Sequence, residues 1–473
     1  MGKETGFIDY KRENPNKRPV EERIKDYKEI FIPMDYKDVK VQASRCMDCG
    51  VAFCSSEFGC PLGNTIPEMN DLVYRGQWKE ALDMLLRTNN FPEFTGTVCP
   101  ALCENACILG LYSESVCNKS MEKSIINKGF EEGYIKAKPP IVRTDKKIAV
   151  IGSGPSGLAC ADQLNKAGHN VIVFERDDNV GGLLTYGIPD FKLEKYVVDR
   201  RINLMKEEGI IFKTNMWIGR DYPANYLKRE YDVLVLCGGA TQARDLPVPG
   251  RTLEGLYFAV DYLKQQNKRN RGIEIEENEI TAKGKNVVVI GGGDTGNDCI
   301  GTAIRQGAKN VYQIDRSSKN SKYKSLDSNK TWPLGPMIFK TSTSHEEGGI
   351  RDFSVKTVAF SGEAGKVKKL HAIRMDENYN EIPGTEFEID CDLVLFAMGF
   401  LHPEHESMIY DLGVELDNRG NVKTNSKYQT SVEGVFSAGD MRTGQSLVAK
   451  SIAEGRNVAR EIDLYLMGNT NLR

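Results

Sequence analysis

Hydrophobic and polar positions along the chain predict short buried strands, each followed by a glycine-rich turn and a helix. The clearest case starts with the β-branched run Ile148–Ile151, which is typical of a buried strand. Three glycines follow in the spacing G-x-G-x-x-G: Gly152, Gly154 and Gly157. A helix with alanine and leucine comes next, and a second strand, Val171–Phe174, ends at Glu175. The stretch therefore predicts a strand–turn–helix–strand unit.

This order is typical of a dinucleotide-binding domain. The first glycine makes a tight turn, the second lets a pyrophosphate approach the backbone, and the third lets the helix pack closely on the strand. The helix N-terminus presents unpaired N–H groups and the positive end of its dipole to the phosphates. Glu175, roughly 20 residues further on, can accept a hydrogen bond from the adenosine ribose. A bare glycine turn would not explain the whole series.

A second unit of the same kind follows. The strand Asn286–Ile290 precedes Gly291, Gly293 and Gly296, which have the same spacing, and Val311–Ile314 is its second strand. Two units predict two bound dinucleotides, unless one unit has lost its ligand.

The residues after this second strand bear on the nicotinamide cofactor. Asp315 lies where an acidic residue would bind a ribose 2′-hydroxyl, which favours NADH. Arg316 follows it, with three lysines close behind: Lys319, Lys322 and Lys324. A basic cluster suits a 2′-phosphate, because an arginine can bind phosphate with two hydrogen bonds and a permanent charge. A solvated basic loop is the alternative. We expect NADPH, since the basic residues outnumber Asp315.

Three further buried runs end in glycine: Tyr231–Cys237, Asp392–Ala397 and the run that begins at Val435. The last leads to Asp440 and a predicted helix over Ser446–Met467, which suits contact of Asp440 with the ribityl chain of a flavin. We infer that the second unit is inserted into the first, and that the C-terminal segment completes the flavin domain. The candidate binding residues are Gly152, Gly154, Pro155, Ser156, Gly157, Glu175, Arg176, Gly182, Leu183, Gly238, Gly239, Gly439, Asp440, Leu447 and Val448 for the flavin, and Gly291, Gly293, Asp294, Thr295, Arg316 and Gly399 for the nicotinamide cofactor.

Cysteines gather ahead of these units. Eight of the twelve fall in two groups, Cys46, Cys49, Cys54 and Cys60, then Cys99, Cys103, Cys107 and Cys117. The segment between the groups, 66–86, has helical periodicity, so the cysteines lie on loops and helix ends of a small helical domain. Clustered thiolates at short spacing suit [4Fe–4S] clusters, which need four ligands each. Structural zinc and plain buried thiols are the alternatives.

Length and charge limit the other possibilities. A chain of 473 residues is expected to have about three domains. The net charge of −3 gives no reason to expect nucleic acid or an anionic membrane. The sequence has no long apolar run and no signal peptide, so we expect a cytosolic protein with reduced thiols. The predicted architecture is an α-helical iron–sulfur domain (1–140) followed by two nested α/β Rossmann-like domains: a flavin domain (141–250 and 405–473) and an inserted second dinucleotide domain (251–404).

This arrangement resembles the small (beta) subunit of glutamate synthase and the related N-terminal part of dihydropyrimidine dehydrogenase. The most specific matching segments are 46–50 (CMDCG), 99–104 (CPALCE) and 342–349 (STSHEEGG). The resemblance implies FAD in the first unit, NADPH in the second, two [4Fe–4S] clusters, and a large-subunit partner that makes glutamate from glutamine and 2-oxoglutarate. A ferredoxin:NADP oxidoreductase or sulfide dehydrogenase subunit of the same architecture is one alternative. A non-catalytic electron-transfer scaffold is another.

The resemblance also implies the cluster ligands. One cluster takes Cys46, Cys49, Cys54 and Cys107, and the other takes Cys60, Cys99, Cys103 and a non-cysteine ligand near Glu122. Counting cysteines alone would choose Cys117 as the eighth ligand, but we favour Glu122. The other four cysteines, Cys160, Cys237, Cys299 and Cys391, are expected to be inert core residues. No catalytic residue is identified from the sequence, and His345 has either a structural or a catalytic role.

Overall fold

Short helices make up the N-terminal part of the chain. The computed structural model describes residues 2–275, 278–319, 332–333 and 341–473. The helices before the first strand are α1 (Gly6–Asp9), α2 (Val20–Arg23), α3 (Tyr36–Ala43), η1 (Phe53–Ser55), α4 (Ile66–Tyr74), α5 (Trp78–Leu86), α6 (Pro92–Val98), α7 (Leu102–Asn105), η2 (Ile108–Leu111) and α8 (Asn118–Glu131). Helices α3, α4, α5 and α8 share an apolar core that includes Val39, Met69, Leu82 and Ile125. The predicted helical domain is thus present.

Two details of this part differ from the sequence-based expectation. The periodic segment 66–86 forms two helices, α4 and α5, because the chain turns at Gly76 with a φ of +76°. The low apolar content of residues 127–145 predicts a linker into the first sheet domain, but helix α8 runs to Glu131, so the first of these residues are helical. Its face of Met121, Ile125 and Ile126 is fully buried. Packing thus extends the helix into a segment with few apolar residues.

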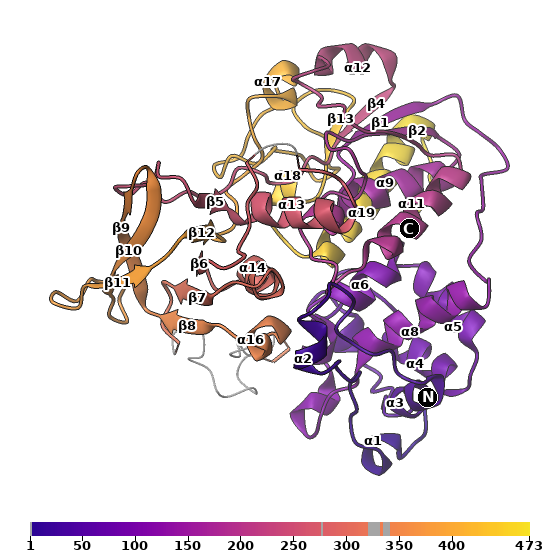
Figure 1. The fold of residues 1–473 in the computed structure, drawn as a ribbon. Helices are drawn as coiled ribbons and strands as arrows, with labels where there is room; N and C mark the ends of the chain where they lie inside the picture. The colour runs from indigo at the N-terminus through magenta and orange to yellow at the C-terminus, as the bar shows by residue number, and fades with distance from the viewer. Residues whose placement is uncertain (1, 276–277, 320–331, 334–340) are drawn as a thin grey trace.

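The first parallel sheet has the strand order β13–β4–β1–β2–β3. Its strands are β1 (Lys147–Ile151), β2 (Asn170–Phe174), β3 (Ile211–Lys213), β4 (Val233–Leu236) and β13 (Val435–Ser437). Its helices are α9 (Pro155–Lys166), α10 (Leu183–Tyr186), α11 (Lys195–Glu207), α12 (Ala224–Glu230), α17 (Met408–Leu412), α18 (Asp440–Thr443) and α19 (Val448–Met467). Helices α9 and α19, from opposite ends of the unit, pack side by side (Figure 1).

The second parallel sheet has the order β5–β12–β6–β7–β8. Its strands are β5 (Leu256–Phe258), β6 (Asn286–Ile290), β7 (Asn310–Asp315), β8 (Ile350–Phe353) and β12 (Leu393–Phe396), and its helices are α13 (Ala259–Asn270), α14 (Asp294–Arg305) and α16 (Thr343–Glu347). An antiparallel sheet of β9 (Val355–Glu363), β10 (Lys366–Arg374) and β11 (Phe387–Asp390) extends from it (Figure 1). All these strands lie between β4 and β13 in the sequence, which confirms the nested α/β architecture.

A buried ion-pair cluster joins the N-terminal segment to the second sheet domain. Glu347, at the end of α16, accepts hydrogen bonds from Arg23 Nε (2.7 Å) and from Arg305 Nη1 (2.6 Å). The Arg23 side chain is 1% exposed, and those of Arg305 and Glu347 are fully buried. Arg305 also donates to the backbone oxygen of Asp26. Helix α2 therefore lies against α14 and α16 (Figure 1). In the part of the chain that the structure describes, no helix is long and apolar enough to cross a bilayer.

Candidate cofactor sites

The first glycine-rich loop has a different spatial constraint at each glycine. Gly152 has a φ of +103°, and a Cβ there would lie 2.3 Å from the Cys237 carbonyl oxygen. A Cβ at Gly157 would lie 2.0 Å from the Gly152 oxygen. A Cβ at Gly154 would meet no protein atom within 4 Å. The fold thus requires the outer two glycines, whereas the middle one leaves space that a ligand can fill.

Glu175 fastens this loop to the end of β2. Its carboxylate accepts hydrogen bonds from the Ser153 N–H (3.1 Å), the Ser153 hydroxyl and the Asp177 N–H (2.9 Å). Burial raises the pKa of Glu175, and these hydrogen bonds oppose the rise. A carboxylate has lone pairs left for a ribose hydroxyl. Ser153, which our sequence analysis did not select, therefore helps to set the loop.

A cavity of about 480 Å³ opens beside this loop. Most of the predicted flavin residues line it: Gly152, Gly154, Pro155, Ser156, Glu175, Arg176, Gly182, Leu183, Gly238, Gly239, Asp440 and Val448. Gly157 and Gly439 instead pack against the loop, since a Cβ at Gly439 would lie 2.4 Å from Ser156 Oγ. Leu447 is the N-cap residue of α19. The glycine loop, the turn at Gly182 and the C-terminal segment thus surround one space large enough for a dinucleotide.

Asp440 and Trp217 line different parts of this cavity. Asp440 accepts hydrogen bonds from the hydroxyls of Ser446 (3.0 Å) and Ser451 (3.2 Å), and burial raises its pKa. The guanidinium carbon of Arg176 lies over the indole ring of Trp217, 4.9 Å from the centre of that ring. No sequence motif marks Trp217 or the two serines, so only the folded chain identifies them.

The second glycine-rich loop repeats the first. A Cβ at Gly291 would lie 2.3 Å from the Ala397 oxygen, one at Gly296 would lie 2.4 Å from the Gly291 oxygen, and one at Gly293 would meet nothing within 4 Å. Helix α14 begins with Asp294 and Thr295. Gly399, just after β12, has a φ of +81° and lies against Gln445 of the C-terminal segment.

The structure describes part of the predicted basic cluster. Asp315, at the end of β7, is 8% exposed and accepts a hydrogen bond from the Ser317 N–H at 2.9 Å. Arg316 is exposed, with its guanidinium 5.4 Å from the ring centre of Tyr379. Lys319 is described and exposed, whereas Lys322 and Lys324 lie outside the described residues. The acidic and basic side chains therefore differ sharply in exposure at the end of this strand.

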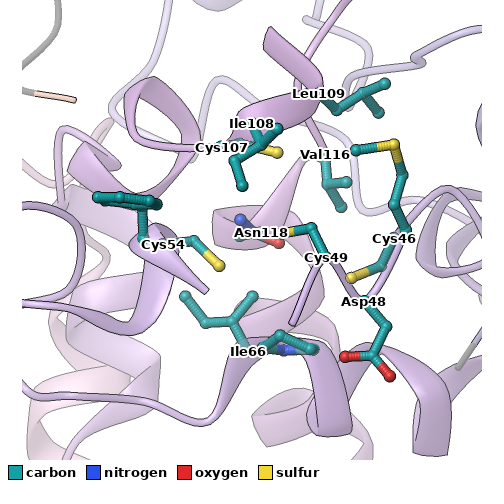
Figure 2. A pocket seen from close by; sticks show the side chains of 13 residues that line it. Cys46, Asp48, Cys49, Cys54, Ile66, Cys107, Ile108, Leu109, Val116 and Asn118 are labelled. Carbon is teal, nitrogen blue, oxygen red and sulfur yellow. The ribbon is translucent and has the colours of Figure 1, made fainter. Parts of the chain in front are cut away.

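Four cysteines line one recess in the helical domain: Cys46, Cys49, Cys54 and Cys107. Figure 2 shows their sulfur atoms directed into the same space, with Ile66, Leu109 and Val116 around it. Burial raises the pKa of Cys46 to about 11 and that of Cys54 to about 12. These thiols must lose protons to become thiolate ligands, so cluster binding releases protons. The recess has the ligand number and the apolar lining that suit an iron–sulfur cluster.

The other three cysteines gather around Glu122. Burial raises the pKa of Cys60 to about 12 and raises that of Cys103 well above its usual value, and the negative charge of Glu122 raises both. Burial also raises the pKa of Glu122 to about 7, although Thr95 and Asn89 donate hydrogen bonds to it. Cys99 is affected by the same carboxylate. Glu122 therefore lies among these three cysteines, where its carboxylate oxygen is a candidate fourth ligand beside the three sulfur atoms.

Cys117 points elsewhere. Its thiol lies 3.8 Å from Gln42 Oε1. Burial and the negative charge of Glu104 raise its pKa to about 12, and the positive charge of Arg12 opposes the rise. The four cysteines outside the helical domain are buried, as expected: Cys160, Cys237, Cys299 and Cys391. Among the described residues, no three His, Cys, Asp or Glu side chains are arranged to hold a single metal ion.

Comparison with known proteins identifies the family. The model of the pyridine nucleotide-disulphide oxidoreductase family matches residues 146–455, and that of dihydropyrimidine dehydrogenase domain II, 4Fe-4S cluster, matches residues 23–134. The glutamate synthase [NADPH] small chain of Mycobacterium tuberculosis is 48% identical over 99% of this chain and 96% of its own. That of Bacillus subtilis is 47% identical over the full length of both. The chain belongs to the glutamate synthase small-chain family.

Members of this family also occur within longer proteins. The glutamate synthase [NADH] of Schizosaccharomyces pombe is 46% identical over the whole of this chain, which corresponds to 23% of that protein. Mycobacterium tuberculosis FprA in complex with NADPH has a TM-score of 0.51 and 18% identity, over 69% of this chain and 86% of that one. That likeness shows the fold alone. The family and the fold predicted from the sequence are therefore confirmed.

Proposed function

We propose that this chain is the electron-input subunit of a glutamate synthase. It oxidises NADPH with FAD and passes electrons through two [4Fe–4S] clusters to a large subunit, which makes glutamate from glutamine and 2-oxoglutarate. The observation that carries the proposal is the 48% identity with the glutamate synthase [NADPH] small chain of Mycobacterium tuberculosis. The two glycine-rich loops and the two cysteine groups of this chain agree with it. When bound, the flavin takes two electrons together and releases them singly, as iron–sulfur clusters require.

The loop of the first unit is proposed to hold the FAD pyrophosphate. The free space at Gly154 and the N-terminus of α9 offer backbone N–H groups and a positive dipole end to the phosphates. Glu175 accepts a hydrogen bond from the adenosine ribose. Asp440, which Ser446 and Ser451 orient, contacts the ribityl chain. These roles keep the flavin in the cavity beside Gly238 and Gly239.

The two cysteine groups differ in what packs beside them. Leu62 and Val98, which lie close to Cys60 and Cys99 in the sequence, pack against an apolar cluster made mostly of residues of the flavin domain. The group of Cys60, Cys99, Cys103 and Glu122 is therefore proposed as the first acceptor of electrons from the flavin. The group around Cys49 is proposed as the exit, because Cys49 is exposed and its neighbour Val51 is 65% exposed.

Glu122 is the proposed eighth ligand, so its replacement by alanine should remove one cluster. We expect iron to fall from about eight to about four atoms per chain, since each [4Fe–4S] cluster needs its full ligand set. Cys117→Ala is the control and should keep about eight. Iron and sulfide analysis of protein purified without oxygen measures both variants. Loss of iron from Cys117→Ala with retention by Glu122→Ala would reverse the assignment.

Arg316 is proposed to bind the 2′-phosphate of NADPH. Because one charge-assisted contact is lost, Arg316→Ala should lower kcat/KM for NADPH by about 10- to 150-fold and leave NADH use nearly unchanged. Flavin reduction followed with each cofactor tests this. Equal losses for both cofactors, or a wild-type protein that prefers NADH, would mean that the buried carboxylate of Asp315 sets the choice.

Two experiments separate this proposal from its alternatives. Bleaching of the flavin by NADPH would exclude a non-catalytic scaffold. Isolation of the native protein, followed by an assay of NADPH- and glutamine-dependent glutamate formation, tests the partner. If the protein is isolated with no large subunit and reduces ferredoxin instead, the ferredoxin:NADP oxidoreductase alternative is the better one.

A further inference from the structure

His345 lies between the start of α16 and strand β7. Its Nδ1 accepts a hydrogen bond from the Ser342 N–H at 3.2 Å, and its Nε2 lies 2.9 Å from Gln313 Oε1. Because Nδ1 accepts from a backbone N–H, the ring is neutral and carries its proton on Nε2. Burial, together with the nearby cations Arg351 and Lys192, lowers the pKa of His345 to about 4. The imidazole therefore donates to Gln313.

Gln313 connects His345 to the second glycine-rich loop. Its Nε2 donates to the carbonyl oxygen of Gly291 at 2.9 Å, and its side chain is buried beneath the loop at 3% exposure. A Cβ at Gly296 would lie 3.0 Å from the same nitrogen. Both ends of the amide are thus in use. Loss of the histidine would leave the amide oxygen buried without a donor, which favours reorientation of the amide.

The first unit has no such chain of contacts. Val173 occupies the matching place in β2, since it pairs with Val150 as Gln313 pairs with Val289. That loop is held instead by Ser153, which donates to Glu175. In the second loop, Gly292 stands where Ser153 stands, and it has no hydroxyl. Position 292 of the second loop therefore cannot donate a hydroxyl hydrogen bond as Ser153 does in the first loop. In the second loop, Gln313 holds the Gly291 carbonyl instead.

We propose that His345 and Gln313 are positioning residues for the nicotinamide cofactor. The contact from His345 fixes the amide of Gln313, and this amide fixes the Gly291 carbonyl. The loop N–H groups at the start of α14 are then directed to the pyrophosphate before the cofactor arrives. This inference rests on the proposed function, because it takes the second loop as the NADPH site. It also gives a role to the histidine of the segment 342–349.

Two substitutions at His345 separate this role from that of a helix cap. Asparagine can still accept from the Ser342 N–H but is too short to reach Gln313. Glutamine can reach Gln313 with its amide nitrogen. We expect His345→Asn to weaken NADP⁺ binding and to raise the KM for NADPH about tenfold. The flavin content and the rate at saturating NADPH should stay unchanged, and His345→Gln should stay within about threefold of wild type.

Gln313→Leu should resemble His345→Asn, and the double variant should lose no more than either alone, because the two residues act in one chain of contacts. His371→Asn, on β10 where His371 contacts Ser361, is the matched control and should behave as wild type. Equilibrium binding of NADP⁺, which cannot reduce the flavin, is measured for each variant. Correct folding is checked by FAD content.

The outcomes distinguish this inference from the proposed function. Wild-type affinity in His345→Asn would overturn the inference, since the histidine would then be only a cap for α16. Equal losses in His345→Asn and His345→Gln would also overturn it, because contact with Gln313 would not matter. Failure of NADPH to bleach the flavin of the wild-type protein would instead overturn the proposed function, whatever the NADP⁺ affinities.

Discussion

Replacement of Glu347 by alanine is expected to lower the stability of the chain by about 3–5 kcal/mol. The substitution leaves the guanidinium of Arg305 buried without the carboxylate it pairs with, and leaves that of Arg23 with only the more exposed Glu346; the two arginine side chains are 0% and 1% exposed. A buried charge without a partner is costly, because the interior cannot solvate it. The denaturant midpoint of the intact chain, followed by tryptophan fluorescence, measures the loss.

Glu346→Ala provides the control for this prediction. Glu346 also pairs with Arg23, at 3.2 Å, but its side chain is 33% exposed. Water replaces such a partner, so the loss should stay below about 1 kcal/mol. Equal losses at the two positions would mean that burial does not set the strength of the cluster. Replacing Glu347 together with Arg23 and Arg305 by apolar residues should recover much of the stability, since no unpaired charge remains.

Gly154→Val is expected to yield a folded protein that lacks FAD. The loop at Gly154 has a φ of −66°, and a Cβ there meets no protein atom within 4 Å, so the chain itself tolerates a side chain. The valine would fill the space proposed for the pyrophosphate. If the pyrophosphate loses two charge-assisted hydrogen bonds to the loop, each of about 1.5–3 kcal/mol, the affinity for FAD falls by about 150-fold or more. The flavin absorbance of the purified protein measures this.

Gly293→Val is the matched variant, because Gly293 has the same free space in the second loop. It should keep its FAD and lose NADPH binding. The assignment of the two units fails if Gly293→Val removes the flavin while Gly154→Val retains it. Gly152 and Gly157 are unsuitable for this test, since a side chain at either position would meet backbone atoms at 2.3 Å or less.

The features that the sequence predicted are those that depend on neighbouring residues. The buried strands, the two glycine loops and the two cysteine groups each lie within a few turns of chain, where spacing shows directly in the sequence. Gly154 and Gly293 were predictable because each is the middle glycine of a G-x-G-x-x-G motif, and a Cβ at either position meets no protein atom within 4 Å. The turn at Gly76 was missed because periodicity continues on either side of it.

The features that the sequence did not predict join distant segments. Arg23 and Glu347 are separated by 324 positions, and His345 and Gln313 by 32. Each is an ordinary polar residue until folding buries it beside its partner. Cysteine spacing alone could not choose between Glu122 and Cys117, and only the family resemblance favoured Glu122, because the arrangement of the helices is what brings Glu122 beside Cys60 and Cys103. Pairing across domains leaves no periodic signal.

The insertion of one sheet domain into the other imposes an order on biosynthesis. Strand β13 pairs with β4, and the Ser437 hydroxyl donates to the Leu236 oxygen 201 positions earlier in the chain. A ribosome adds about 5–20 residues per second, so β4 waits about 10–40 s for this neighbour. Asp440 and α19, which complete the flavin cavity, emerge later still. The inserted domain can therefore fold first, and flavin capture waits until the segment from β13 to α19 has been made.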